Sequence, residues 1–371
     1  MGSFFRFLLH NSKKSITFAA AKVCGMKIAF TTELPKEGFR RLEAYLNHGQ
    51  QTSSADSIEQ VLSPTDRWAV LVGEAGWQEA EILVSTFDYQ VPREMIESMP
   101  HLRLIANFGA GFNNIDLEAC KERGIRVTNT PQPVIEPTAE LAFALMIDVA
   151  RRVSEFDRNI RISGLGVSGL GISGLGKAHI EFGVMRNLSH SLYGKTLGII
   201  GMGRIGQSLA RRAAASGMRI IYHNRHRLED ERIRGLEGLT AEYVDFQTLL
   251  QDSDFVSLNL PYTPEVHHLI GKPELGMMKR TAFLINTARG AHVDEEALVE
   301  ALQSGIIAGA ALDVYEHEPQ IHPGLLTLPN VVLSPHTGTG TWEGRIAMCE
   351  NVTDNIIAFA EGRTKDMNIV I

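Results

Sequence analysis

The chain has 371 residues, of which 44% are hydrophobic and 21% are charged, and its formal net charge is -7. This length and composition suit a globular protein of two domains, and the negative charge excludes a general attraction to nucleic acid or to an anionic membrane. Three cysteines without metal-ligand spacing support neither a disulfide framework nor a zinc site, and no apolar run is long enough to span a bilayer. We therefore expect a cytoplasmic protein without a metal site.

The first 25 residues form a basic extension. They carry four Lys or Arg residues, several serines and no acidic residue. This composition is compatible with an organelle transit peptide, and equally with a misassigned start or a disordered tail. Sequencing the N-terminus of the mature protein separates these alternatives.

From residue 26 onward, short apolar runs alternate with helical segments. Strands are expected at 27–30, 80–84 and 103–106, and helices at 36–46 and 138–152. The last of these helices has apolar residues at helical spacing and two arginines at its end, where the helix dipole favours cations. We expect it to be a buried helix that leads into a central α/β domain.

A repeat follows this helix. Residues 162–176 read ISGLGVSGLGISGLG, a five-residue period repeated three times. The period is too short for a solenoid unit, and so many small residues bury too little apolar area to offset the chain entropy. We expect a mobile surface loop.

The most specific motif spans residues 197–227, which read as strand, glycine turn, helix and strand. Its three glycines have GxGxxG spacing after an apolar run. The first glycine permits the tight turn, the second lets the backbone approach a pyrophosphate, and the third lets the helix pack on the strand. The helix N-terminus offers N–H groups to the anion. We expect a dinucleotide site that includes Gly201, Gly203, Arg204, Ile205 and Gly206.

The end of the second strand predicts which dinucleotide binds. Where an NAD-binding fold places an acidic residue for the ribose hydroxyls, this chain has Asn224 followed by Arg225. A carboxylate would repel a 2′-phosphate, whereas an amide tolerates it and a guanidinium binds it through charge-assisted hydrogen bonds. We therefore expect NADP(H) to be preferred over NAD(H). A solvated basic turn without a ligand is the alternative.

Four more strands are expected, at 255–259, 282–286, 308–313 and 331–333. Each ends in a polar or Pro/Gly cluster. In a doubly wound sheet, ligands bind outside the carboxyl ends of the strands. The chemistry is therefore expected in the clusters LPYTPE, NTARG, DVYEHEP and SPHTGTG.

Five motifs in order resemble those of the D-isomer-specific 2-hydroxyacid dehydrogenase family, closest to its glyoxylate/hydroxypyruvate reductases. The resemblance runs from about residue 26 to the C-terminus. It implies an α/β fold with two Rossmann-like domains: a central doubly wound parallel sheet at 129–335 that binds the nucleotide, and a smaller, split, flavodoxin-like substrate domain at 26–128 and 336–371. The motifs are NFGAGFNNID, GMGRIG, INTARG, ALDVYEHEP and SPHTG.

The resemblance implies that Arg289, Glu318 and His336 form a catalytic set. Reduction of a 2-keto acid needs a cation for the carboxylate, a hydride from the nicotinamide and a proton for the carbonyl oxygen. Arg289 would supply the cation and His336 the proton. Glu318, paired with the imidazole, would favour its protonated form and fix its tautomer. A glutamate rather than a glutamine in this role favours hydroxyacid over formate chemistry.

Other contacts follow from the same resemblance. The backbone N–H groups of Gly109, Ala110 and Gly111 would bind the substrate carboxylate, and residues 85–87 would line the substrate pocket. Thr138 and Asp313 would lie near the nicotinamide end of the cofactor, and Leu260 and Pro261 beside its adenosine. Thr287 completes the expected cofactor contacts.

The partners and rival functions also follow from the resemblance. A homodimer is expected, although the repeat replaces a tryptophan-containing stretch that contributes dimer contacts in the family. D-lactate and D-3-phosphoglycerate dehydrogenases are rival activities, and the missing acidic residue of NAD enzymes argues against both. A nucleotide-sensing scaffold without turnover is the rival from another class, because transcriptional corepressors resemble the same family.

Overall fold

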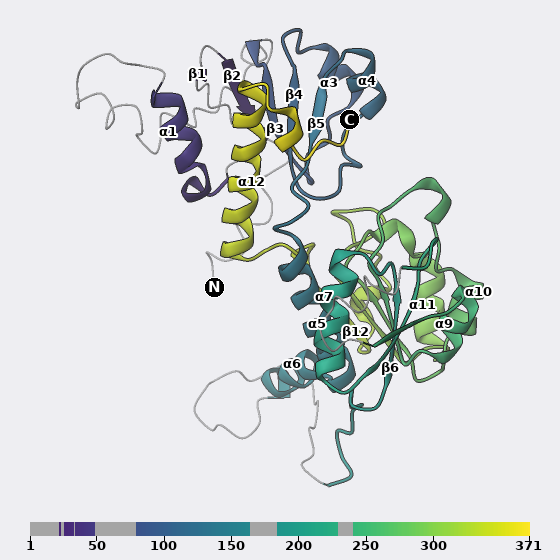
Figure 1. Ribbon diagram of the computed structural model, residues 1–371. Helices are drawn as coiled ribbons and strands as arrows, with labels where there is room; N and C mark the ends of the chain where they lie inside the picture. The colour runs from purple at the N-terminus through teal and green to yellow at the C-terminus, as the bar shows by residue number, and fades with distance from the viewer. Residues whose placement is uncertain (1–21, 24–25, 33, 49–78, 164–183, 229–239) are drawn as a thin grey trace, which may run out of the picture. The chain divides into compact units, whose positions relative to one another are not determined.

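The computed structural model describes residues 22–23, 26–32, 34–48, 79–163, 184–228 and 240–371 (Figure 1). The chain divides into two compact units, Met1–Val134 with Gly340–Ile371, and Ile135–Thr339. The sequence predicts these boundaries at 128/129 and 335/336. Most of the basic extension, and the repeat beyond residue 163, lie outside the described residues.

The first unit is built on a five-stranded sheet in which neighbours follow chain order. β2 to β5 are parallel, and β1 is antiparallel to β2. The two central strands β3 and β4 are buried along their whole length, as expected of parallel strands covered on both faces. The strands are β1 (Lys22–Val23), β2 (Met26–Phe30), β3 (Ile82–Thr86), β4 (Leu104–Phe108) and β5 (Arg126–Thr128).

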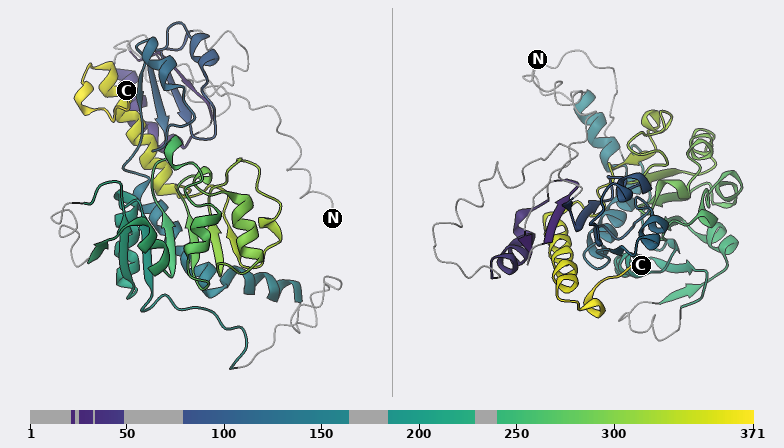
Figure 2. Two further views of the ribbon diagram at one scale, coloured as in Figure 1. Left: turned by 90° about the vertical axis from the view of Figure 1, so that its right-hand side faces the viewer. Right: turned by 90° about the horizontal axis from the view of Figure 1, so that it is seen from above.

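The helices of this unit come from both ends of the chain. The C-terminal helix α12 packs along β4 and beside η1 and α1 (Figure 2). A Cβ atom on Gly38 of η1 would lie 2.3 Å from the Cβ atom of Cys349 in α12, so these helices meet at their backbones. The helices are η1 (Lys36–Phe39), α1 (Arg40–His48), α3 (Arg93–Glu97), α4 (Leu117–Glu122), α12 (Trp342–Ala360) and η6 (Thr364–Asp366).

The second unit is built on a seven-stranded sheet that is parallel throughout, in the order β12-β11-β10-β9-β6-β7-β8. The chain order reverses between β6 and β9, which makes their carboxyl ends the topological switch point where such sheets bind ligands. The strands are β6 (Thr196–Ile200), β7 (Arg219–His223), β8 (Ala241–Tyr243), β9 (Phe255–Leu258), β10 (Phe283–Asn286), β11 (Gly309–Leu312) and β12 (Val331–Leu333).

Helices cover both faces of this sheet (Figure 1). α5 and α7 pack on each other and on one face, while α9, α10 and α11 cover the other. The α5 residues Leu145, Met146 and Val149 are buried, as their helical spacing predicts. The helices are α5 (Ile135–Arg151), α6 (Val153–Ser163), α7 (Arg204–Ala215), α9 (Phe246–Asp252), α10 (Lys272–Met277), α11 (Glu295–Gln303) and the short η3 (Pro264–Val266), η4 (Gly290–His292) and η5 (Leu325–Thr327).

The α/β class predicted from the sequence is confirmed: one sheet is parallel throughout, and the other is parallel from β2 to β5. The predicted strands and helices are present, with ends that differ by up to three or four residues; the predicted helix 138–152, for instance, begins at Ile135. None of the described helices combines the length and the apolar character needed to cross a membrane.

Candidate active site

The glycine turn after β6 has the geometry that a dinucleotide requires. Gly201 has a φ of +97°, and a Cβ atom there would lie 2.6 Å from the Asn259 carbonyl oxygen. A Cβ atom on Gly206 would lie 2.4 Å from the Gly201 carbonyl oxygen, whereas the Cβ position of Gly203 has no neighbour within 4 Å among the described residues. Gly203 caps α7, which begins at Arg204. The turn therefore leaves space for a pyrophosphate where the helix begins.

Asn224, which follows β7, holds this turn in place. Its Oδ1 accepts a hydrogen bond of 2.7 Å from the Met202 N–H. Its carbonyl oxygen accepts one of 3.3 Å from the Tyr243 hydroxyl. Arg225, the next residue, is exposed. The side chain of Asn224 thus has a structural partner that the sequence motif did not reveal.

Two buried polar atoms lie at the ends of neighbouring strands. Asn259 follows β9 and Thr287 follows β10, and neither Asn259 Oδ1 nor Thr287 Oγ1 has a hydrogen-bond partner within the described part of the chain. Leu260 is half-buried beside the glycine turn and Pro261 is exposed. Because buried polar atoms are almost always satisfied in native proteins, these atoms fit the polar groups of a bound dinucleotide.

Glu318 and His336 form a hydrogen-bonded pair on the loops after β11 and β12. Glu318 Oε2 lies 2.7 Å from His336 Nδ1, and Glu318 Oε1 accepts a hydrogen bond of 2.9 Å from the Tyr315 N–H. Burial alone would raise the pKa of the Glu318 carboxyl, but the hydrogen bond and charge of His336, with the charge of Arg289, lower it below its ordinary value. The carboxylate is therefore ionised at neutral pH and orients the imidazole.

Arg289, on the loop after β10, is positioned by the backbone around it. The carboxamide of Asn286 donates to the Arg289 carbonyl oxygen at 2.9 Å and accepts from the Ala288 N–H at 3.0 Å. Arg289 Nη1 donates to the Ala288 carbonyl oxygen at 2.6 Å. Burial lowers the pKa of the guanidinium, and the charge of Glu318 opposes that effect. A guanidinium has five N–H donors, so this arrangement is able to bind a carboxylate.

Asp313 organises the turn that carries His336. Its Oδ1 accepts the Thr337 N–H and its Oδ2 accepts the Gly338 N–H, both at 2.8 Å. A Cβ atom on Gly338 would lie 3.4 Å from the side chain of Thr138, which is buried in α5. The structure thus brings Asp313 and Thr138 together beside the turn that carries His336.

The predicted substrate-binding residues Gly109, Ala110 and Gly111 lie in the first unit, directly after β4. The Gly109 N–H already donates to the Asn107 carbonyl oxygen at 3.1 Å. The carbonyl oxygens of Ala110 and Gly111 accept hydrogen bonds of 2.8 Å from the side chains of Asn129 and Asn107. These bonds fix the loop. The N–H groups of Ala110 and Gly111 are therefore the candidates for the predicted contact with the substrate carboxylate.

Arg345 is a candidate functional residue that the sequence motifs did not predict. Its guanidinium lies over the rings of Phe87 and Phe108, 5.7 and 5.6 Å from their centroids, at the carboxyl ends of β3 and β4. Burial lowers its pKa, and the charge of Asp88 opposes that effect. A cation in the first turn of a helix interacts unfavourably with the helix dipole. The position of Arg345 near the start of α12 is therefore the feature of the sequence that could have identified it.

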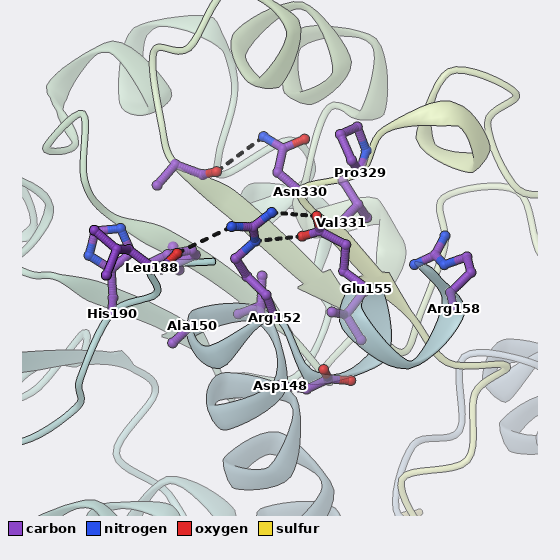
Figure 3. Close-up of a pocket in the computed structure, with 14 residues that line it drawn as sticks. Asp148, Ala150, Arg152, Glu155, Arg158, Leu188, His190, Pro329, Asn330 and Val331 are labelled. Atoms are coloured by element: carbon purple, nitrogen blue, oxygen red, sulfur yellow. Dashed lines mark hydrogen bonds and ion pairs between the residues drawn. The ribbon is translucent and has the colours of Figure 1, made fainter. Parts of the chain in front are cut away.

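The second unit also has a cavity of about 280 Å³ (Figure 3). Residues of α5 and α6 line it together with the amino ends of β10, β11 and β12. Arg152 is one of the lining residues, and it forms an ion pair of 2.5 Å with Glu155 and a hydrogen bond of 3.2 Å to the Leu188 carbonyl oxygen. The cavity is therefore at the opposite edge of the sheet from Arg289 and His336.

Comparisons with known proteins find similar sequences and similar structures. Residues 143–338 match the family profile described as D-isomer specific 2-hydroxyacid dehydrogenase, NAD binding domain. A glyoxylate reductase of Thermococcus litoralis is 43% identical over 337 residues, which cover 91% of this chain and 94% of that protein.

Two solved structures differ in their cofactors. An NADPH-dependent glyoxylate/hydroxypyruvate reductase of Sinorhizobium meliloti, in complex with NADP and malonate, is similar with a TM-score of 0.69 and 29% identity over 90% of this chain and 92% of that one. A D-lactate dehydrogenase of Aquifex aeolicus, complexed with NAD and lactic acid, has a TM-score of 0.68 and 29% identity over 86% and 97%.

Proposed function

Because this chain belongs to the D-isomer-specific 2-hydroxyacid dehydrogenase family, we propose that it reduces a small 2-keto acid, of the glyoxylate or hydroxypyruvate type, to the D-2-hydroxy acid with NADPH. The chain is an NAD(P)-dependent oxidoreductase. The observation that carries the proposal is the 2.7 Å contact between Glu318 Oε2 and His336 Nδ1. The charge of Arg289 contributes to the lowered pKa of Glu318.

In the proposed reaction each catalytic residue has one task. A nicotinamide cofactor, when bound, would supply the hydride for the carbonyl carbon. Arg289 binds the carboxylate of the keto acid and polarises its carbonyl group. The protonated imidazole of His336 donates its proton to the carbonyl oxygen, and in the oxidation direction it takes that proton back. Glu318 orients the imidazole and compensates its positive charge.

The size of the substrate and the choice of cofactor have separate support. The Thermococcus litoralis relative is named a glyoxylate reductase, which favours a two- or three-carbon keto acid. Asn224 and Arg225 favour NADPH, since no carboxylate stands at the end of β7 to repel a 2′-phosphate. The Sinorhizobium meliloti structure, solved with NADP, is an example of a similar chain with this cofactor.

The test is a substrate panel that follows oxidation of NADPH and of NADH spectrophotometrically. Glyoxylate, hydroxypyruvate, pyruvate and phosphohydroxypyruvate are compared by kcat/KM. We expect glyoxylate or hydroxypyruvate with NADPH to give the highest values. Turnover of pyruvate alone would indicate a D-lactate dehydrogenase, and turnover of phosphohydroxypyruvate alone a D-3-phosphoglycerate dehydrogenase. Tight cofactor binding without any turnover would indicate the scaffold.

We further propose that the protein is a homodimer through α6 and the segment 184–193. These parts of the second unit expose large apolar side chains, and the segment is joined to the end of α5 by Arg152 (Figure 3). Several large apolar side chains exposed close together in the sequence favour an interaction surface. Light scattering is expected to give twice the chain mass for the wild type and a monomer for Leu188→Asp. The exposed residues include Val153, Ile160, Met185, Leu188 and Tyr193.

A reducing compartment, in the first place the cytoplasm, is part of the same proposal. Cys120 and Cys349 are buried free thiols, and structural thiols of this kind suit a reducing environment. Fractionation of cells that express the full chain tests this, and recovery in an organelle would favour the transit-peptide interpretation of residues 1–25.

A further inference from the structure

A second histidine–carboxylate pair lies beside the catalytic one. His268 Nε2 is 2.6 Å from Glu316 Oε1, and Glu316 stands two residues before Glu318. Both pairs therefore take their carboxylate from the loop after β11. The imidazole of His268 comes from the loop after β9, so the pair joins the loops of two different strands.

The backbone of His268 is bound to the loop of Arg289. The His268 N–H donates to the carbonyl oxygen of Ala291, two residues beyond Arg289, at 2.8 Å, and the Ile270 N–H donates to the carbonyl oxygen of His292 at 2.9 Å. His268 has a φ of +49°, a left-handed conformation that few residues other than glycine adopt. In this conformation His268 bonds Ala291 through its backbone and Glu316 through its side chain.

The loops of Arg289 and Glu318 pack directly against each other. A Cβ atom on Gly290 would lie 1.8 Å from the carbonyl carbon of Tyr315 and 2.3 Å from the nitrogen of Glu316. The Glu316 N–H donates to the buried carboxyl of Glu295 at 2.8 Å. Any shift of Glu316 is therefore passed to the backbone next to Arg289.

From these contacts we infer that His268 is a positioning residue which, through Glu316, sets the place of Arg289 relative to Glu318. The inference rests on the proposed function, because that function assigns Arg289 to the substrate carboxylate. Displacement of a binding group by about 1 Å costs a large factor in rate. Loss of the His268–Glu316 pair should therefore weaken keto-acid binding without reaching the glycine turn after β6.

The geometry of this cluster favours a hydrogen-bonded pair over a metal site. Ligand atoms of His267, His268 and Glu316 all lie within 4.8 Å of one another. The rings of His267 and His268, however, are stacked with centroids 4.0 Å apart and planes inclined by only 20°. A metal ion bound by imidazole nitrogen lies near the plane of the ring, so these two stacked rings cannot share one ion in this arrangement.

The test compares His268→Asn and Glu316→Ala with a matched control. Asparagine tolerates the left-handed backbone of His268 but is too short to keep the bond to Glu316. The control Glu296→Ala removes another histidine–glutamate pair, in which Glu296 Oε2 lies 2.9 Å from His322 Nε2 and the Glu296 side chain is 86% exposed.

Steady-state kinetics and cofactor binding are measured for each variant. In His268→Asn and Glu316→Ala we expect the KM for the keto acid to rise roughly tenfold, with a smaller fall in kcat. The Kd for NADPH, measured by fluorescence, is expected to stay within about twofold of the wild-type value, as are all constants of Glu296→Ala. A KM unchanged in both pair variants would overturn the inference.

Two further variants separate positioning from a general loss of stability. Glu316→Gln keeps an oxygen that accepts the imidazole N–H, and its KM is expected to stay within about threefold of the wild-type value. The double variant of His268→Asn and Glu316→Ala should raise KM no more than either single variant, because the effects of two substitutions in one contact are not additive. A KM as high in Glu316→Gln as in Glu316→Ala, or additive losses, would contradict positioning by this bond.

Arg289→Lys distinguishes failure of this inference from failure of the proposed function. If Arg289→Lys leaves the KM for the keto acid unchanged, the role proposed for Arg289 is wrong. If Arg289→Lys raises KM while His268→Asn and Glu316→Ala do not, only the positioning inference is wrong.

Discussion

Glu318 binds His336 with one carboxylate oxygen, at 2.7 Å, and the Tyr315 N–H with the other, at 2.9 Å. The carboxylate is therefore fixed by the backbone of its own loop before it orients the imidazole. Because these contacts also lower the pKa of Glu318, the carboxylate keeps its negative charge throughout the neutral range.

Glu318→Gln should impair reduction of the keto acid without changing cofactor affinity. The amide preserves size and hydrogen bonding but removes the charge that favours a protonated imidazole. We expect kcat/KM for the keto acid to fall by roughly 100-fold, while the Kd for NADPH stays unchanged. Steady-state assays and a fluorescence titration with NADPH check this, and a kcat/KM equal to that of the wild type would contradict the role of Glu318.

Asn224→Asp should weaken the preference for NADPH. An aspartate retains an oxygen for the Met202 N–H, so the glycine turn keeps its anchor, while the added charge repels a 2′-phosphate. The ratio of kcat/KM for NADPH to that for NADH is expected to fall by about tenfold or more. Arg225→Ala, which removes the neighbouring cation, should change the ratio in the same direction. An unchanged ratio in both variants would show that the end of β7 does not select the cofactor.

His292 should make stability depend on pH. Burial lowers the pKa of His292 to about 4, and the side chain is fully buried. The unfolded chain binds this proton at a higher pH than the folded protein, so stability is lost as pH falls from about 6.5 toward 4. As the pH falls from about 7.5 to about 5, this single group lowers the free energy of unfolding by about 2 kcal/mol.

Urea unfolding of the wild type and of His292→Phe at these two pH values measures that contribution. The decrease in the free energy of unfolding should be smaller in the variant by this amount, because its side chain does not titrate. The comparison cancels the other titrating groups. An equal decrease in both proteins would mean that His292 is not buried in its neutral form.

The sequence predicts the fold well where local rules determine structure. The GxGxxG spacing predicts the turn because Gly201 needs a positive φ and Gly206 has no room for a side chain. The apolar runs predict the strands because parallel strands are buried on both faces. The ordered motifs similarly direct attention to Glu318 and His336, which the structure joins by a hydrogen bond.

What the sequence does not predict depends on contacts between distant residues. The bond from Met202 to Asn224, the pairing of His268 with Glu316 and the position of Arg345 over Phe87 and Phe108 are of this kind. No spacing rule relates a loop after β9 to one after β11, because their distance is set by strand order in the sheet. The positive φ of His268 is likewise imposed by its surroundings and not by residue type.

His336 donates the proton in the proposed reaction, and His336→Ala removes the group that would donate it. The measurement is the rate of NADPH oxidation with glyoxylate and with hydroxypyruvate, alongside the Kd for NADPH. We expect turnover to fall by at least about 100-fold while the Kd stays within about twofold of wild type. A folded His336→Ala protein that reduces either keto acid at the wild-type rate would show that His336 is not the proton donor.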